Sequence, residues 1–438
     1  MTERIQLSAS ASARPIAAAV AALVSGLVLV SAQSQNREPP RAARMLASAA
    51  GTATGPTVGQ PATLGEPDSA TDFQVRIEGV QRPSRQGLDV LTIEEVMERF
   101  GVPGMSVAVI RNFEVHWAKG YGIADVETGM PVDDATLFQA ASISKPVTAM
   151  AALAAAEDGR FSLDDDINAI LTSWRLPGNG FTEARPVTPR LLFSHTAGLG
   201  DGHGFPGYEP QAPRPTPVQI LRGDAPSNVG PVTMVRTPLT AMQYSGGGTT
   251  IMQLALTDVF GEPFPEIMRT SVLEPAGMTH STFLQPLPPA LDENAARGHR
   301  GDGQPMGDAR WHVYSAMAAA GLWTNARDLA RFAIEVQRSA RGDPGSVLTA
   351  SSAAEMLSPI GVGPFAVGFQ VERLGEGWYF SHSGGNWGFV CHLIAHKVKG
   401  YGLAVMTNSS GGGVVSREVQ ERVQRAYGWD ALDKPVLR

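Results

Sequence analysis

Ser142 and Lys145 are the residues of this sequence best suited to nucleophilic chemistry. They lie in the segment Phe138-Gln-Ala-Ala-Ser-Ile-Ser-Lys145-Pro-Val. On a helix, positions i and i+3 share one face, so the lysine ammonium nitrogen can reach the serine hydroxyl. Pro146 has no N–H and is tolerated only in a first turn, so the helix must start close to Ser142. Free backbone N–H groups and the helix dipole would then stabilise negative charge beside the serine.

The serine–lysine spacing is by itself a weak signal. An N-capping serine followed by a surface lysine would give the same pattern. Ser144, the other serine of the segment, points about half a turn away and is the lesser candidate nucleophile. Two further segments favour the functional interpretation.

Tyr244 precedes three consecutive glycines in Tyr244-Ser-Gly-Gly-Gly248, in a polar loop before a helix expected from Ile251. A tyrosine in such a loop is exposed unless something packs on it. Its ordinary pKa is about 10, and an adjacent ammonium would stabilise the phenolate, which makes Tyr244 a candidate general base. The alternative is a loop tyrosine with no task.

The segment His382-Ser383-Gly384-Gly385 follows a strand expected over 378–381. Small residues after His382 would let a substrate backbone lie along the strand, and an N–H there could donate to an oxyanion. The alternative for His382 is a core histidine whose ring nitrogens are already paired.

Other reactive side chains favour structural roles. Cys391 is the single cysteine, and its apolar, strand-like setting is typical of a buried thiol. His392 and His396 are four positions apart, but on a strand that spacing does not bring two rings onto one ion. His195 is expected to stabilise a loop. No metal or other cofactor is predicted.

The candidate residues need a scaffold built from both ends of the chain. Helices are expected over 91–100, 142–157, 251–260, 265–274, 325–337 and 415–427, and strands over 105–110, 114–120, 365–373, 378–381, 388–396 and 402–407. Thr92 and Glu95 form a capping box for the first helix. Strands at both ends with helices between them predict a sheet assembled from distant segments, beside a mainly helical lobe.

Composition narrows the class of protein. With 43% hydrophobic and 18% charged residues, the chain is typical of a globular protein. Its formal net charge of -7, without a basic run, argues against nucleic-acid binding. The expected partner is a small-molecule or peptide substrate.

The N-terminal region reads as an export signal followed by a linker. Residues 1–32 combine Arg4 and Arg14 with an apolar run and the small residues of Val30-Ser-Ala32, as in a cleavable signal peptide. An uncleaved anchor is the alternative. Residues 33–85 are predicted to be a flexible linker and residues 86–430 the folded domain. We expect a periplasmic or secreted protein without stable membrane association after signal removal.

The three candidate segments, in this order, resemble those of the penicillin-recognising serine hydrolases. That family includes class C β-lactamases, D,D-carboxypeptidases, D-aminopeptidases and related esterases. Three other stretches share the resemblance: Gly101-Val-Pro-Gly-Met-Ser-Val-Ala-Val-Ile110, Leu191-Leu-Phe-Ser-His-Thr-Ala-Gly-Leu199 and Ala319-Ala-Gly-Leu-Trp-Thr-Asn-Ala-Arg-Asp-Leu-Ala-Arg331. The resemblance implies an α+β fold of the β-lactamase/transpeptidase type, with an antiparallel sheet flanked by helices and a mainly helical lobe.

The resemblance also implies roles for individual residues. Ser142 would attack a carbonyl, and Lys145 would take or relay its proton. Tyr244 matches the Tyr of the family's Y-x-N element, which protonates the leaving group. His382 matches the first position of the K-T-G element. The N–H groups of Ser142 and Gly385 would form the oxyanion hole, with Gly246, Ser383 and Gly384 lining the substrate site.

Two departures bear on the substrate. The Y-x-N asparagine is Gly246, and the K-T-G lysine is His382, as in the aminopeptidase and esterase branches. Both changes weaken recognition of a penicillin's side chain and carboxylate, so hydrolysis of small esters, amides or D-amino-acid peptides is expected. A class C-like β-lactamase or D,D-carboxypeptidase, and a penicillin-binding sensor or scaffold that fails to deacylate, are the alternatives. An α/β-hydrolase with its elbow at Ser245 is disfavoured because the first glycine of G-x-S-x-G is absent.

Overall fold

The computed structural model describes residues 69–81, 87–201 and 204–432. Contacts divide the chain into two units, residues 1–63 and 64–438, and all described residues belong to the second. The expected signal peptide, residues 1–32, therefore lies outside the described residues.

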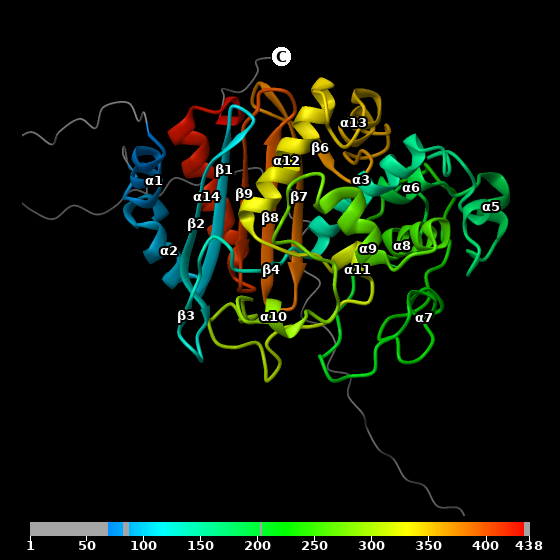
Figure 1. Cartoon of the computed structure of the whole chain (residues 1–438), viewed down its shortest axis with the longest axis horizontal. Helices are drawn as coiled ribbons and strands as arrows, with labels where there is room; N and C mark the ends of the chain where they lie inside the picture. Colours follow the sequence, from blue (N-terminus) through cyan, green and yellow to red (C-terminus); the bar gives the residue numbers. More distant parts are fainter. Residues whose placement is uncertain (1–68, 82–86, 202–203, 433–438) are drawn as a thin grey trace, which may run out of the picture. The chain divides into compact units, whose positions relative to one another are not determined.

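A seven-stranded antiparallel sheet in the order β3-β2-β1-β9-β8-β7-β6 is the centre of this unit (Figure 1). Its strands are β1 Gly104–Arg111, β2 Glu114–Asp125, β3 Met130–Pro131, β6 Gln370–Leu374, β7 Gly377–Asn386, β8 Phe389–His396 and β9 Gly402–Thr407. A separate pair joins β4 Phe138–Gln139 to β5 Trp323–Thr324. The strand β1 pairs with β9 along its length, with Val107 opposite Val405. The sheet is therefore assembled from both ends of the chain, as predicted.

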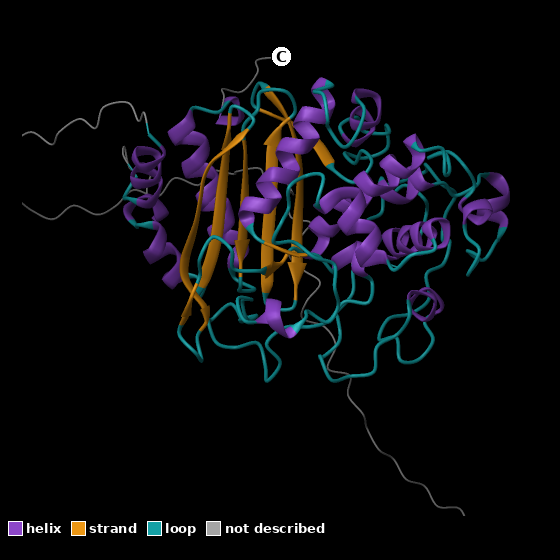
Figure 2. Cartoon of the chain, in the orientation of Figure 1, coloured by secondary structure: helices purple, strands orange, loops and turns teal. Residues whose placement is uncertain are grey.

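Helices cover both faces of the sheet (Figure 2). The helices of the described residues are α1 Ala70–Glu78, α2 Ile93–Arg99, α3 Ser144–Glu157, α4 Ile167–Ile170, α5 Gly180–Ala184, α6 Pro189–Phe193, α7 Pro217–Arg222, α8 Gly246–Phe260, α9 Phe264–Met268, α10 Pro289–Asp292, α11 Met317–Ala320, α12 Ala326–Arg341, α13 Ala350–Met356 and α14 Gly412–Tyr427. Some of them, such as α5 and α7, lie beside the sheet and not on its faces (Figure 1).

Alternation along β1 shows how the two faces are used. Val107 and Val109 are buried in one cluster with apolar residues of α1, α2 and α14. Ala108 and Ile110 are buried in the larger cluster, which holds residues of α12 and of the helical segments between β2 and β6. Because successive side chains of a strand point to opposite faces, one buried strand serves two cores. The fold is α+β, with an antiparallel sheet between layers of helices, as predicted.

The predicted linker is wrong at its C-terminal end. The helix α1 lies within residues 33–85, begins at N-cap Ser69 and has a capping box with Asp72. The ring of Phe73 stacks on Tyr427 of α14 with centroids 3.9 Å apart. The Ala-, Gly- and Pro-rich composition upstream is typical of a linker and does not indicate this short helix, which is stabilised by packing against α14. Residues 33–68 and 82–85 lie outside the described residues.

Most other elements match the expected ranges, with differences at their ends. The Thr92–Glu95 capping box of α2 is confirmed. The helix α8 begins at Gly246 and not at Ile251, and β6 begins at Gln370 and not at Phe365. The helix expected over 265–274 consists of α9 and a following π-helical turn, Arg269–Leu273.

Candidate active site

Ser142 lies in a tight turn between β4 and α3. Ala141–Ile143 forms a 3₁₀ turn, and α3 begins at Ser144, two residues later than expected. Ala141 has a φ of 50°, a left-handed conformation that non-glycine residues rarely adopt and that often marks a functional site. The turn leaves Ser142 half-buried, while its neighbours Ala141 and Ile143 are fully buried.

Lys145 is buried beside Ser142. Its Nζ donates to Ser142 Oγ at 3.1 Å and to the carbonyl oxygen of Ala319 at 2.8 Å. The same nitrogen lies 4.9 Å from the centre of the Tyr244 ring. Burial lowers the pKa of Lys145 to about 7, against the opposing charge of Asp201. Near neutral pH a large share of this amine is therefore unprotonated and able to accept a proton.

Tyr244 lies against Lys145 and Ser142. Its ring is 4.2 Å, centre to centre, from that of His195 and 6.1 Å from that of His382. Burial raises the pKa of Tyr244, although a hydrogen bond with the Ser142 side chain opposes the shift. The expected phenolate is therefore not favoured, because the ring is packed away from water. Tyr244 is better suited to donate and relay a proton as a neutral phenol.

The N-terminus of α8 fixes the residue after Tyr244. Ser245 is the N-cap, and its Oγ accepts the N–H of Gly248 at 2.8 Å. Asp201 accepts the Ser245 hydroxyl at 2.5 Å and the Gly247 N–H at 2.7 Å. Burial raises the pKa of Asp201. Sequence reasoning missed Asp201, since no local pattern links it to residues more than forty positions away.

His382 is a neutral histidine at the inner face of β7. It is 5% exposed, and its Nδ1–H donates to the Ser383 carbonyl oxygen at 2.7 Å. Burial and the charge of Lys145 lower the pKa of His382 to about 3. Its imidazole is therefore uncharged throughout the neutral range.

Ser383 lies partly outside the site. Its hydroxyl is 2.9 Å from His392 Nδ1 and is exposed on the face of β7 opposite His382, because side chains alternate along a strand. Only the backbone of Ser383 can therefore line the predicted substrate site, because its side chain points away from His382.

Gly384 lies directly against the Ser142 turn. A Cβ at this position would be 2.2 Å from the Ala140 carbonyl oxygen and 3.1 Å from the Ser142 nitrogen. Any side chain here would displace the turn that carries the nucleophile, so only glycine fits.

Gly385 presents its N–H on the unpaired side of β7. The Lys397 N–H donates to the Trp378 carbonyl oxygen, so even-numbered residues of β7 bond toward β8 and odd-numbered ones toward β6. Pairing with β6 ends at Ser381, opposite Gln370. The Gly385 N–H is therefore free of the sheet ladder and available to an oxyanion. An added Cβ at Gly385 would meet open space.

Two amide side chains that sequence reasoning missed connect β7 to the segment before Ser142. Asn386 Nδ2 donates to Gln139 Oε1 at 2.9 Å and to the Ala320 carbonyl oxygen at 3.0 Å. Gln139 Nε2 donates in turn to the His312 carbonyl oxygen at 2.7 Å. These bonds hold the end of β7 against the turn of the nucleophile.

The rejected candidates have structural roles. Ser144 Oγ donates to the Ala141 carbonyl oxygen at 2.6 Å and accepts the Leu322 N–H at 3.0 Å. Cys391 is fully buried, and burial raises the pKa of its thiol. His396 Nδ1 accepts two backbone N–H groups of the β8–β9 turn. Within the described ranges, no group of three or more His, Cys, Asp or Glu side chains is arranged to hold a metal ion.

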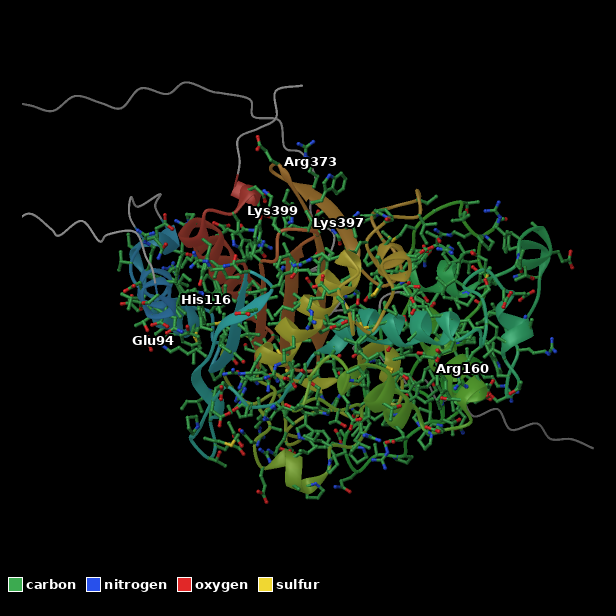
Figure 3. All side chains as sticks on the ribbon, turned by 45° about the horizontal axis from the view of Figure 1, so that its top comes forward. Glu94, His116, Arg160, Arg373, Lys397 and Lys399 are labelled. Atoms are coloured by element: carbon green, nitrogen blue, oxygen red, sulfur yellow. The ribbon has the colours of Figure 1, made fainter. Side chains whose placement is uncertain are left out.

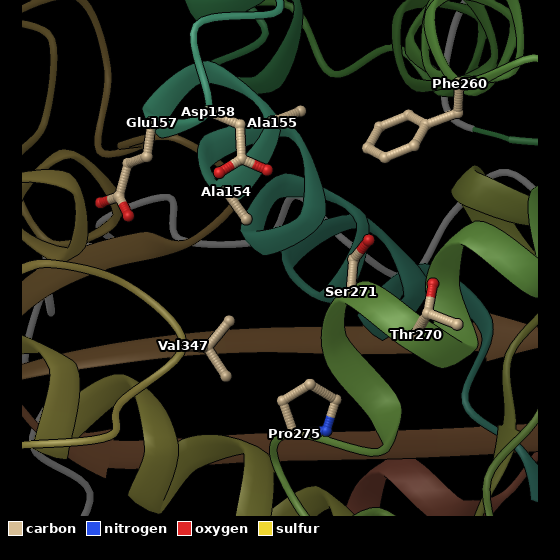
Figure 4. A pocket seen from close by; sticks show the side chains of 9 residues that line it. All are labelled: Ala154, Ala155, Glu157, Asp158, Phe260, Thr270, Ser271, Pro275 and Val347. Carbon is tan, nitrogen blue, oxygen red and sulfur yellow. The ribbon is translucent and has the colours of Figure 1, made fainter.

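Two surface features lie apart from these residues. A cavity of about 340 Å³ is lined by the C-terminal turn of α3, including Glu157 and Asp158, and by Phe260, whereas Ser142 precedes the other end of this helix (Figure 4). Arg373, Lys397 and Lys399 gather where β6 connects to β7 and β8 to β9 (Figure 3). Neither feature includes a residue of the Ser142 cluster.

Comparisons with known proteins agree with this geometry. A family model described as beta-lactamase matches residues 91–427. Protein flp of Staphylococcus aureus (strain N315) is 26% identical over 213 residues, which are 46% of this chain and 39% of that protein. The aligned part thus spans less than half the length of that curated relative.

Solved structures share the fold at low identity. D-amino acid amidase from Ochrobactrum anthropi SV3, complexed with L-phenylalanine, superposes with a TM-score of 0.63 at 22% identity, over 82% of this chain and 98% of that one. The octameric penicillin-binding protein homologue from Pyrococcus abyssi gives 0.61 at 24% identity, over 77% and 76%.

The chain belongs to the beta-lactamase family, whose members are generally serine hydrolases. The resemblance carried by the serine–lysine, tyrosine and histidine segments is confirmed at this level.

Proposed function

We propose that this protein is a serine hydrolase that forms an acyl-enzyme on Ser142. The observation that carries the proposal is the buried Lys145 amine, 3.1 Å from Ser142 Oγ and with a pKa lowered to about 7. Neutral Lys145 takes the hydroxyl proton as Oγ attacks the substrate carbonyl carbon. The N–H groups of Ser142 and Gly385 donate to the resulting oxyanion.

Collapse of the tetrahedral intermediate breaks the bond to the leaving group. Tyr244 gives its phenolic proton to the departing alkoxide or amine and regains one from the Lys145 ammonium. A water molecule then attacks the acyl carbon and its proton passes to the Tyr244–Lys145 pair. The pair returns a proton to Ser142 Oγ as the bond between Oγ and the acyl carbon breaks and the carboxylic acid leaves. The neutral phenol of Tyr244, held against both side chains, supports this relay.

We propose small esters, amides or D-amino-acid peptides as the substrate class. Gly246 has no side-chain amide to pair with a substrate's acylamino group, and the neutral His382 ring has no positive charge to pair with a substrate carboxylate. In the penicillin-recognising family that this sequence resembles, binding of a β-lactam relies on both contacts. The D-amino acid amidase that shares the fold supports amides as one branch of this class.

A turnover screen tests the proposal. We expect wild-type protein to hydrolyse p-nitrophenyl acetate or D-amino-acid amides with a higher kcat/KM than nitrocefin, and Ser142→Ala to lose this activity. A preference for nitrocefin above about tenfold, or 1.4 kcal/mol, would identify a lactamase instead. A single stoichiometric burst without turnover would identify a penicillin-binding sensor.

Export is a second proposal, carried by the sequence of residues 1–32. Among the residues that the structure describes, no helix is long and apolar enough to cross a membrane. Mass spectrometry of protein recovered outside the cytoplasm should find a new N-terminus near Gln33. A full-length product retained in the membrane fraction would favour an uncleaved anchor.

A further inference from the structure

The ring of Phe205 fills the space beside Gly246. A Cβ at position 246 would lie 3.5 Å from Phe205 Cδ2, an ordinary contact distance, but only 3.0 Å from Phe205 Cε2, which is closer than ordinary van der Waals contact. An asparagine at this position, two residues after Tyr244, would therefore require Phe205 to move. The departure from Y-x-N is therefore more than the loss of a side chain, because an aromatic ring from another loop lies 3.0 Å from the point where the asparagine side chain would begin.

The other contacts of Phe205 lie beside Lys145. Phe205 packs with Val229 against a small apolar cluster of Ile220, Ala316 and Ala319. The carbonyl oxygen of Ala319 accepts the Lys145 Nζ–H at 2.8 Å. Phe205 thus lies next to Gly246, two residues after Tyr244, and packs on the cluster that includes Ala319, whose carbonyl oxygen accepts the lysine hydrogen bond.

The segment that carries Phe205 is fixed to the rest of the helical lobe. The carbonyl oxygen of Pro206 accepts His312 Nδ1–H at 2.9 Å. Two backbone hydrogen bonds then join Tyr208 to Val313. Phe205 itself is half-buried, so part of its side chain is accessible to a ligand.

We propose that the partly buried side chains of Phe205 and Val229, packed on the buried cluster of Ile220, Ala316 and Ala319, form an apolar subsite for the acyl group of the substrate, which selects alkyl or aryl acyl chains over acylamino ones. The inference rests on the proposed function, since it places the acyl chain of the Ser142 adduct. None of these side chains offers a hydrogen-bond donor or acceptor. An acylamino group bound there would lose hydrogen bonds to water, whereas each buried methylene adds about fourfold to binding.

Two esters of equal size separate these possibilities. The acyl groups of p-nitrophenyl 4-methylpentanoate and p-nitrophenyl N-acetylglycinate contain the same number of heavy atoms, but only the second contains an amide. Each kcat/KM is divided by the rate constant for hydroxide hydrolysis of the same ester, which removes intrinsic reactivity. Wild-type protein should then prefer the alkyl ester by at least tenfold.

Substitutions at Phe205 locate the preference. Phe205→Ala should lower the alkyl-to-acylamino ratio at least fivefold, and Phe205→Leu should keep it within about threefold of wild type. Phe181→Ala is the matched control, because Phe181 is 39% exposed on α5, a helix without buried residues. Circular dichroism confirms that each variant is folded, and the wild-type ratio tests the proposal without any variant.

The outcomes distinguish this inference from the proposed function. Equal normalised rates for the two esters in wild type, or an unchanged ratio in folded Phe205→Ala, overturn the subsite alone. If wild type hydrolyses neither ester faster than Ser142→Ala, the proposed function fails and the subsite with it.

Discussion

At the scale of single residues, burial of Lys145 is the feature that supports its proposed role as the base. The side chain is 2% exposed, and the opposing charge near it is Asp201. An ammonium deprived of water loses its proton more easily, so burial converts a common cation into a base matched to neutral pH. The same burial keeps Tyr244 protonated and His382 uncharged.

The pH profile of ester hydrolysis should therefore show one ionisation near neutrality. Because Lys145 must be unprotonated to accept the Ser142 proton, kcat/KM should rise with pH through about 7 and level off above it. His382, with a pKa lowered to about 3, should add no step between pH 5 and 9. Lys145→Arg should lose activity across this range, since arginine stays protonated.

A profile that falls as pH rises through 7 would contradict the role of Lys145 as base. An unchanged profile in a folded His382→Gln variant would confirm that the histidine does not supply the neutral-pH step.

The proximity of Ser142 and Lys145 could be predicted from sequence, whereas the ionisation of the residues around them could not. The Ser142–Lys145 spacing is local, and the 3₁₀ turn at Ser142 followed by the first turn of α3 brings the two side chains together. The phenolate expected at Tyr244 is not favoured, because its ring is buried against His195 and Phe365. Both residues lie far from Tyr244 in the sequence, so no local pattern indicates this burial.

At the scale of elements, the N-terminus of α8 positions Tyr244. Asp201 holds the cap residue Ser245 and the Gly247 N–H, and carboxylates at helix N-termini are stabilised by the unpaired N–H groups and the helix dipole. Tyr244 immediately precedes the cap residue Ser245. The position of the Tyr244 side chain therefore depends on the hydrogen bonds that Asp201 makes to Ser245 and Gly247.

Asp201→Ala should destabilise the protein and lower its activity together. Loss of both bonds to the cap should reduce the free energy of unfolding by about 1–2 kcal/mol and kcat by at least tenfold. Urea unfolding and ester turnover measure the two effects. Ser245→Thr, which keeps a capping hydroxyl, is the control and should keep both near wild type. Full activity in Asp201→Ala would show that the cap does not position Tyr244.

Element prediction succeeded where the signal was local. The Thr92–Glu95 capping box marks the start of α2 correctly. The start of α8 was placed five residues late, because three glycines normally indicate a loop, and here the Ser245 and Asp201 cap stabilises them as a first helical turn. The side chain of Ser383 points away from the site because of the register of β7, and that register is determined by its pairing with β8, not by the local sequence.

At the scale of the whole described unit, the N-terminal helix is held by one buried arginine of α14. Arg422 pairs with Glu418 at 2.7 Å. It also donates to the carbonyl oxygens of Ile77, Gly79, Leu88 and Leu91. A single guanidinium thus satisfies backbone carbonyl groups at the end of α1 and before α2, and these contacts hold α1, which lies upstream of the predicted domain boundary, against α14.

Arg422→Ala should destabilise the fold strongly. The substitution leaves the buried Glu418 carboxylate and four carbonyl oxygens without their donor, so the free energy of unfolding should fall by about 3 kcal/mol or more. Arg417→Ala, at an exposed arginine of the same helix, should change it by less than about 0.5 kcal/mol. Equal effects in urea unfolding of the two variants would contradict the anchoring role.

Covalent labelling of Ser142 tests the central claim most directly. An alkyl p-nitrophenyl phosphonate should release one equivalent of p-nitrophenol, abolish ester hydrolysis in parallel, and leave its phosphonyl group on Ser142 in peptides mapped by tandem mass spectrometry. Ser144→Ala should be labelled like wild type, and Ser142→Ala should not be labelled. A phosphonyl group on Ser144 or Ser245, or full ester turnover by Ser142→Ala, would contradict the account.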